Sequence, residues 1–334
     1  MVTAIMSLQQ VSVAQLPYRR YKRLRNDTLT TSDGVDIYLR NIRSFDLKML
    51  FAARIIDAES SPLDPLRVST GISADYFLPR WGSFSADVRG AWFSYLQQQA
   101  TTENLSQNAL NPFLVANVGG RAHFLDGKGD IFRRITLGIY HDINDDGSPH
   151  TTVRYIRMPF PCKRISAVRA GWYYSRMPVS ANINKDVIDP EEKGSVRTAD
   201  GSVFTGNYHT NVTNNGFYLG FTRIINMHLH VSSNIDTFEG QTRKKIGFYK
   251  EFYADVIVAN TQFDPFRVAG NDYHIKPNDA GSFKTSNIGW RVGGRTTSNK
   301  QHMSLGLFYE IGGRPGIFPY SLYAGGGLIL TYLK

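Results

Sequence analysis

Two histidines and a serine occupy one face of a predicted strand, where their side chains could do chemistry together. In the segment from Met227 to Ile235, His228, His230 and Ser232 alternate with Leu229 and Val231. Alternate residues of a β-strand point to the same side of the sheet. Paired imidazoles can bind a metal, and an imidazole can act as a base toward a serine. A hydrolase using His228, His230 or Ser232 is therefore one hypothesis, although such residues are also common as ordinary polar strand residues.

Two other motifs suggest metal chemistry and then fail a requirement for it. DINDDG, from Asp142 to Gly147, has the alternating oxygen ligands of a calcium loop. The downstream Glu that such a loop requires is missing from residues 149–153, so we interpret the motif as a turn. The lone cysteine, Cys162, excludes an internal disulfide and a Cys-based zinc cluster, and MPFPCKR predicts a turn around it. We therefore predict neither a metal nor a cofactor.

Basic residues are concentrated near the beginning of the chain. The formal net charge is +10, and YRRYKRLR supplies five basic residues within eight positions. Such an arm can neutralise nucleic acid, and it can equally meet anionic headgroups or an acidic partner. The residues of this basic tail are Arg19, Arg20, Lys22, Arg23 and Arg25.

A further set of charged residues alternates with apolar residues inside predicted strands. Its members are mostly arginines and carboxylates, and Lys is scarce among them. Arg pairs well with carboxylates in a confined space because its planar fork makes bidentate hydrogen bonds. These residues are predicted to line the lumen of a barrel: Asp87, Arg89, Arg121, His123, Arg134, Asp142, Arg154, Arg169, Glu251, Asp255, Arg291, Arg295 and Glu310.

The elements that must position these side chains are β-strands with one apolar and one polar face. In SFSADVRGAWF, from Ser83 to Phe93, Phe84, Ala86, Val88, Gly90 and Trp92 form the apolar face. About fourteen segments of this kind follow one another, which predicts an all-β fold. They are residues 35–43, 46–57, 66–77, 81–96, 112–125, 131–143, 151–158, 164–177, 216–225, 227–235, 244–259, 284–296, 301–312 and 319–333.

The connections between these segments are of two kinds. DGKGD at 126–130 and TSNK at 297–300 predict tight turns, whereas residues 97–111, 178–215 and 260–283 are long. A membrane barrel carries short turns on one rim and long loops on the other. Counting fourteen strands back from the C-terminus puts the last two long segments on opposite rims. A missed or invented strand would explain this, and GSVRTADGSVFTG at 194–206 is a candidate hidden hairpin.

Composition admits a β-barrel and excludes a helical membrane protein. No apolar run in the 334 residues approaches the eighteen or so that a spanning helix needs, and the mean hydropathy is −0.29. Barrel strands average out on such a scale because half of their residues are polar. The chain contains 18 Tyr, 20 Phe and 4 Trp. We expect aromatic girdles at the two membrane interfaces, formed by Phe77, Trp81, Phe124, Tyr320 and Tyr332.

The same alternation would also suit a soluble β-sandwich, with the apolar faces on a core. A sandwich usually presents Lys and Glu to open water, whereas here the strand polar faces carry Arg and carboxylates. The apolar faces are also long, reaching seven alternating positions in the last segment, which approaches the nine to eleven residues of a membrane-crossing strand. We therefore predict a single closed antiparallel transmembrane β-barrel of about fourteen strands, with short turns and several long loops, and keep the sandwich as an alternative.

Both ends of the sequence resemble those of bacterial outer-membrane proteins. Residues 1–14 end in Ser12, Val13 and Ala14, which resembles a secretory cleavage site before Gln15, with the front of the signal peptide missing. YSLYAGGGLILTYLK, at 320–334, resembles the C-terminal strand of these proteins, although Lys334 stands where a Phe is usual. With the alternating strands, these features resemble an outer-membrane β-barrel of the type common in the Bacteroidota. The predicted organisation is a signal peptide at 1–14, a basic tail at 15–33 and a barrel at 34–334.

This resemblance implies an outer-membrane location, lipid as the main partner and no enzymatic activity. The expected role is a passive channel for small polar or anionic solutes, or an accessory subunit of a secretion, assembly or motility complex of the envelope. Other envelope proteins are then further partners, and nucleic acid is not. Two alternatives remain open: a soluble, capsid-like sandwich with a nucleic-acid-binding arm, and the barrel hydrolase. The sequence leaves undecided whether the lumen is open or plugged.

Overall fold

The computed structural model describes most of the chain, and its residues divide into two compact units. Described are residues 28–30, 36–40, 48–62, 64–78, 81–95, 113–143, 147, 149–182, 187–188, 207–233, 243–268, 271–275, 284–298, 303–318 and 321–333. The larger unit comprises 46–126, 164–225 and 248–334, and the smaller one comprises 1–45, 127–163 and 226–247. Among the described residues, no helix is long and apolar enough to cross a membrane.

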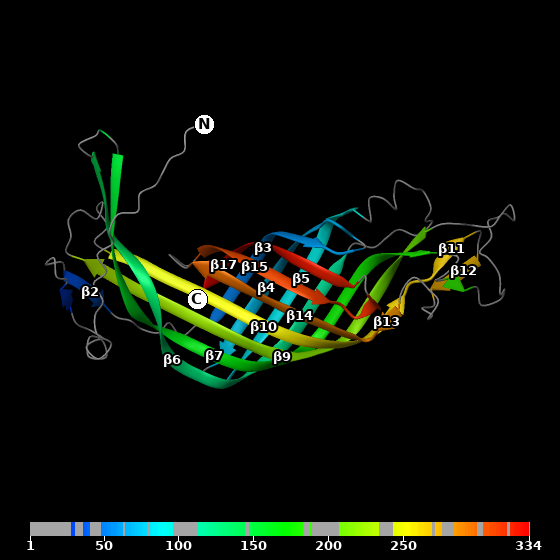
Figure 1. The fold of residues 1–334 in the computed structure, drawn as a ribbon. Helices are drawn as coiled ribbons and strands as arrows, with labels where there is room; N and C mark the ends of the chain where they lie inside the picture. Colours follow the sequence, from blue (N-terminus) through cyan, green and yellow to red (C-terminus); the bar gives the residue numbers. More distant parts are fainter. Residues whose placement is uncertain are drawn as a thin grey trace. The chain divides into compact units, whose positions relative to one another are not determined.

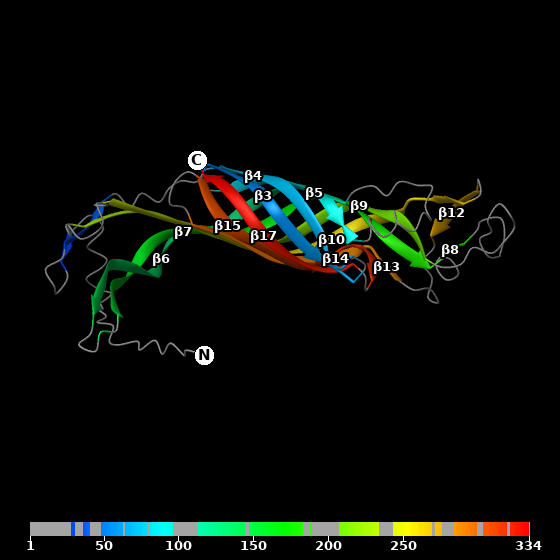
Figure 2. The same cartoon turned by 90° about the horizontal axis from the view of Figure 1, so that it is seen from above.

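Ten strands form a closed antiparallel barrel (Figure 1). The first strand of the ring lies beside the last and pairs with it (Figure 2). β7 (Pro149–Asn182) pairs with β9 (Asn207–Ser233), so that every strand of the ring has two neighbours. Closure leaves no unpaired edge, which is the condition for a sheet to cross a bilayer. The ring consists of β3 (Met49–Ser60), β4 (Arg67–Leu78), β5 (Gly82–Ser94), β6 (Leu114–Ile143), β7 (Pro149–Asn182), β9 (Asn207–Ser233), β10 (Arg243–Phe263), β14 (Ile288–Ser298), β15 (Met303–Gly313) and β17 (Leu322–Leu333).

The remaining strands are short and lie outside this ring. In the smaller unit, β1 (Thr28–Thr30) pairs with β2 (Asp36–Arg40), and β2 pairs with the end of β9. In the larger unit, β8 (Val187–Ile188), β11 (Phe266–Val268) and β12 (Asn271–Ile275) form one small sheet. A second pairs β13 (Lys284–Ser286) with β16 (Gly316–Phe318).

The prediction of a closed antiparallel barrel is confirmed, but the ring has ten strands rather than about fourteen. Three pairs of predicted segments are single strands, namely β6, β7 and β9. The predicted turns at 126–130 and around Cys162 are therefore wrong, because the backbone stays extended through both. The first predicted segment, 35–43, corresponds to β2 outside the ring.

With ten strands in the ring, the long segments no longer fall on opposite rims, as they do when fourteen strands are counted. Because neighbouring strands are antiparallel, successive connections alternate between two sets. One set contains 61–66, 95–113, 183–206, 264–287 and 314–321, and it includes all three segments that the sequence marks as long. The other set, 79–81, 144–148, 234–242 and 299–302, has no member longer than nine residues. In the larger unit, we call the end with the first set the long-connection rim, and the end with 79–81 and 299–302 the short-connection rim. The candidate hairpin at 194–206 lies outside the described residues.

The wall of the larger unit is apolar on its outer side and polar on its inner side. Ile72 is 69% exposed and Leu305 57% exposed, whereas Glu251 and Arg291 are 1% and 3% exposed. β15 alternates without a break from Met303 to Gly312: Met303, Leu305, Leu307, Tyr309 and Ile311 are exposed, and the residues between them, which include Phe308 and Glu310, are buried. A soluble protein has the opposite arrangement. The soluble-sandwich alternative, with its nucleic-acid-binding arm, is therefore wrong in its fold.

Aromatic residues mark both ends of this apolar wall. Trp81 and Phe124 are exposed near the short-connection rim, together with Tyr332, and Trp92 is exposed near the long-connection rim. Trp81 and Trp92 stand at the two ends of β5, and a strand of roughly nine to eleven residues crosses a membrane. The prediction for Phe77 is wrong, because its side chain is buried inside the barrel, and Tyr320 lies outside the described residues.

Candidate functional site

The interior of the barrel is crossed by ion pairs between strands that are not neighbours. Arg89 on β5 donates from Nη2 to Oε1 of Glu310 on β15 at 2.6 Å. Three strands separate these two on the shorter way round the ring. Tyr253 and Tyr323 also donate to the Glu310 carboxylate, at 2.5 and 2.8 Å. Both members of this ion pair are buried, so it joins opposite walls within the lumen.

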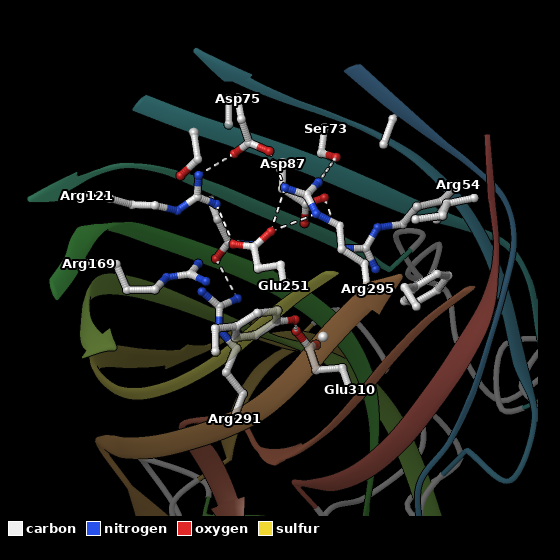
Figure 3. Close-up of a pocket in the computed structure, with 18 of the residues that line it drawn as sticks. Arg54, Ser73, Asp75, Asp87, Arg121, Arg169, Glu251, Arg291, Arg295 and Glu310 are labelled. Atoms are coloured by element: carbon white, nitrogen blue, oxygen red, sulfur yellow. Dashed lines mark hydrogen bonds and ion pairs between the residues drawn. The ribbon is translucent and has the colours of Figure 1, made fainter. Parts of the chain in front are cut away.

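A second group of charges crosses the lumen beside the first (Figure 3). Arg121 on β6 donates to Asp75 and to Glu251, both at 2.8 Å. Arg295 on β14 is paired with the same two carboxylates. Tyr249 adds a hydrogen bond to Glu251 at 3.1 Å. Two arginines and two carboxylates from four strands thus form a closed, charge-balanced cluster.

Two further arginines share a single carboxylate. Nε of Arg291 lies 2.6 Å from Oδ2 of Asp255, and Nε of Arg169 lies 3.2 Å from Oδ1 of the same residue. The guanidinium groups also lie over the rings of Tyr218 and Tyr253, with centroid distances from 4.6 to 5.8 Å. Such stacking holds the guanidinium planes in place.

Near the long-connection rim, Glu59 is held between two arginines. Arg67 donates to its Oε1 at 2.9 Å, and Arg314 donates to both of its oxygens, at 2.8 and 2.5 Å. The Arg67 guanidinium lies 4.1 Å from the centroid of the Phe113 ring, and that of Arg314 lies 4.9 Å from it. Asp64 completes the group by accepting from Arg67 at 3.0 Å.

Nearer the short-connection rim, the interior also contains a cluster of apolar side chains. Buried residues from β3, β4, β7, β9 and β10 contact one another there, which joins opposite sides of the ring. We call this cluster the apolar layer. It consists of Leu50, Ala52, Phe77, Ile165, Ile224 and Tyr249.

Between the charged groups the side chains leave a cavity of about 70 Å³, which we call the lumenal cavity. Its wall includes Arg121, Arg169, Arg291 and Arg295 together with Glu251. A volume of this size holds a few water molecules or one small ion. The described part of the lumen thus has the chemistry of a polar compartment, with donors and acceptors held in place by ion pairs and hydrogen bonds.

The structure brings together most of the residues predicted to line the lumen. Asp87 accepts from Arg54 at 3.1 Å, and His123 Nε2 lies 3.3 Å from Ser83 Oγ. The buried members of the predicted set are Arg89, Arg121, Arg169, Glu251, Asp255, Arg291 and Glu310, while Arg295 is half-buried.

Other candidates fall where the side chains, or the whole residues, lie outside the described part. Arg134, Asp142 and Arg154 are on β6 and β7, and only their backbone is described. The same holds for His228, His230 and Ser232 on β9. The basic tail, Arg19, Arg20, Lys22, Arg23 and Arg25, and the predicted signal peptide lie entirely outside the described residues. Of the predicted tail segment 15–33, only residues 28–30 are described, and they form β1.

Several partners of these residues escaped the sequence analysis. Arg54, Asp57 and Glu59 face inward although their spacing breaks strict alternation, because β3 has a register shift between Arg54 and Asp57. The consecutive residues Ile55 and Ile56 are both exposed on the outer wall. In the sequence, this pair of adjacent apolar residues was the signal that the alternation shifts here. Asp64 and Arg314 lie on connections, where alternation gives no information.

Comparison with known proteins supplies few relatives. No family model matches the chain, and no curated protein matches it. Among solved structures, OmpT, an outer membrane protein of Vibrio cholerae, aligns at 12% identity and a TM-score of 0.19, covering 91% of this chain and 99% of its own. A TodX mutant monoaromatic hydrocarbon channel aligns at 9% identity and a TM-score of 0.22, covering 87% and 91%. Pseudomonas putida OprB aligns at 10% and 0.16, covering 86% and 92%.

At such TM-scores the likeness carries no argument, and the location rests on the chain's own geometry. The ring is closed, its outer wall is apolar with aromatic residues at both ends, and its charges are paired inside. This is the construction of a barrel whose outer wall faces lipid. The chain is an outer-membrane β-barrel protein.

Proposed function

We propose that the chain is a non-enzymatic barrel that works as an accessory subunit of an envelope complex, with a lumen closed by its own strands. The observation that carries this proposal is the filling of the lumen by side chains from opposite walls. Ion pairs such as Arg89–Glu310 cross it, and the apolar layer lies nearer the short-connection rim. In this arrangement the wall and the connections remain available for partners.

The closed lumen is supported by the way in which its charges are satisfied. Asp75, Glu251 and Glu310 each accept from at least two donors on other strands. Removing one member of a buried ion pair costs about 3–5 kcal/mol, so the pairs resist separation. The apolar layer fills further space between opposite walls, and water and ions avoid apolar surroundings.

A passive channel for small polar or anionic solutes is the second candidate, and the polar lumenal cavity favours it. Planar-bilayer recording of the purified full chain separates the two. The sample must first show heat-modifiable migration on a gel, so that silence cannot come from an unfolded barrel. Absence of stepwise current is the result expected of a closed subunit, and discrete conductance steps would establish the channel instead.

The subunit role needs its own measurement. Extraction of native membranes in mild detergent should yield the chain in a discrete assembly larger than the barrel. Recovery of the barrel alone, under conditions that preserve a known envelope complex, would contradict the role. The partners we propose are outer-membrane lipid and other envelope proteins, and not nucleic acid. We also keep the proposals of a Bacteroidota-type protein and of a signal peptide at 1–14, which rest on the sequence features.

A further inference from the structure

Arg169 and Arg291 are the two arginines of the lumenal cavity that share a single directly paired carboxylate. They share Asp255, so that two guanidinium groups face one carboxylate. Figure 3 shows the two guanidinium groups next to each other in the lumen. The two guanidinium groups repel each other, and the single charge of Asp255 offsets this repulsion only in part.

The other carboxylates of the lumenal cavity are already engaged. Asp75 and Glu251 are both paired with Arg121 and Arg295, and Glu310 accepts from Arg89 and two tyrosines. Among the described residues, neither Arg169 nor Arg291 forms a hydrogen bond or an ion pair with any of these three carboxylates. Glu251 still attracts Arg169 and Glu310 still attracts Arg291 through space, but Asp255 is the one carboxylate that pairs directly with these two arginines among the described residues.

Arg291 also has a hydrogen-bonding group to spare. Its Nε donates to Asp255 and its Nη1 to Asn117 at 3.1 Å, but no acceptor among the described residues reaches its Nη2. The residue is 3% exposed and lines the lumenal cavity. Buried donors in proteins are nearly always paired, so an unpaired one beside a cavity marks the place of an absent partner.

We propose that the lumenal cavity binds one small monovalent anion, such as chloride, nitrate or formate, between Arg169 and Arg291. The anion accepts from Nη2 of Arg291 and balances the second guanidinium. The cavity, of about 70 Å³, sets the size limit and excludes a sugar acid such as gluconate. Tyr218 and Tyr253 keep both guanidinium planes in position. The site does not depend on whether the barrel conducts.

The test measures thermal unfolding of the full chain in detergent while chloride, nitrate or formate replaces gluconate at constant ionic strength. An anion that binds only the folded state raises the midpoint temperature of unfolding until the site is saturated. For one weak site we expect a rise of about a few degrees. Arg291→Gln removes the unpaired donor and one charge while Asp255 keeps Arg169, so the midpoint should no longer depend on the anion. Arg176→Gln is the control, because Arg176 pairs with Asp264 away from the cavity, and it should respond like the wild type.

If Arg291→Gln does not fold, Arg169→Gln takes its place, and chloride-35 NMR line broadening on the wild type measures binding without any variant. Broadening that formate reverses and gluconate does not is the expected result. Equal midpoints of the wild type in all four anions, or a full response in a folded Arg291→Gln variant, would overturn the proposal and leave water as the partner of Nη2.

Discussion

Arg89 and Glu310 meet across the lumen at 2.6 Å, although they lie 221 positions apart in the sequence. The contact exists only because the ring closes, since three strands separate β5 from β15 even by the shorter path. Both residues are buried, so each compensates the other's loss of hydration. The pair is therefore a direct product of barrel closure.

The first prediction concerns the coupling in this pair. Arg89→Ala leaves Glu310 buried without its main partner, and Glu310→Ala does the same to Arg89, so each single variant should lose about 3–5 kcal/mol of folding free energy. The double variant should lose clearly less than the sum, because the two opposite charges are removed together and Asp57, the other partner of Arg89, keeps Arg54. Urea unfolding in lipid vesicles, followed by heat-modifiable migration, measures all four proteins. Additive losses would mean that the two residues do not pair.

The second prediction concerns close contact between β6 and β7. A Cβ built on Gly171 would lie 2.5 Å from Cα of Gly119 and 2.8 Å from the Tyr218 hydroxyl, and it would also clash with the Val118 carbonyl. Gly171→Ala should therefore push the two strands apart and reduce the folded fraction markedly. Gly120→Ala is the matched control on the neighbouring strand, since its nearest atom would be 3.7 Å away. The measurement is the yield of folded protein in detergent for each variant. Equal yields for the two variants would contradict the close packing of β6 against β7.

The third prediction tests the outer wall. Val88 lies near the middle of β5 with its side chain exposed on the apolar face. A charge at the midplane of a lipid-facing wall costs about 2–4 kcal/mol, so Val88→Arg should destabilise the barrel by that amount in lipid vesicles. Val88→Leu, which keeps the position apolar, should change stability little. A Val88→Arg variant as stable as the wild type would mean that this face does not contact lipid.

The orientation of the strands could be predicted from the sequence because alternation is a local property. Phe84, Val88 and Trp92 share a face whatever the rest of the chain does, and so do Asp87 and Arg89. The choice of Arg over Lys on the polar face then distinguished a confined lumen from open water. This reasoning identified Arg121, Glu251 and Arg295 without knowledge of their partners.

The number of strands could not be predicted, because turn-forming residues do not always form turns. Asp126 and Gly127 are favourable in a tight turn, but here they lie within β6, whose backbone stays extended through them. Interstrand pairing decides such cases, and it is not visible in a local window. The register shift in β3 has the same origin, since it depends on how β3 pairs with β4 and β17.

The apolar layer was missed for a related reason. Phe77 precedes the apolar Leu78, and Ile224 precedes Ile225, so alternation does not say which member of each pair points inward. Only the closed ring shows that Phe77 and Ile224 contact the same cluster. The sequence therefore predicted a polar lumen and overlooked its apolar layer.

A cysteine scan along β5 tests most directly whether the apolar face of the barrel contacts lipid. In a Cys162→Ser background, single cysteines at residues 84 to 92 carry a fluorescent label, and lipids brominated along their acyl chains quench those labels that contact the bilayer core. Labels at Phe84, Ala86, Val88, Gly90 and Trp92 should be quenched, and labels at Ser85, Asp87 and Arg89 should not. Quenching of the second group, or equal quenching at all positions, would contradict a barrel with its apolar face in lipid and its charges inside.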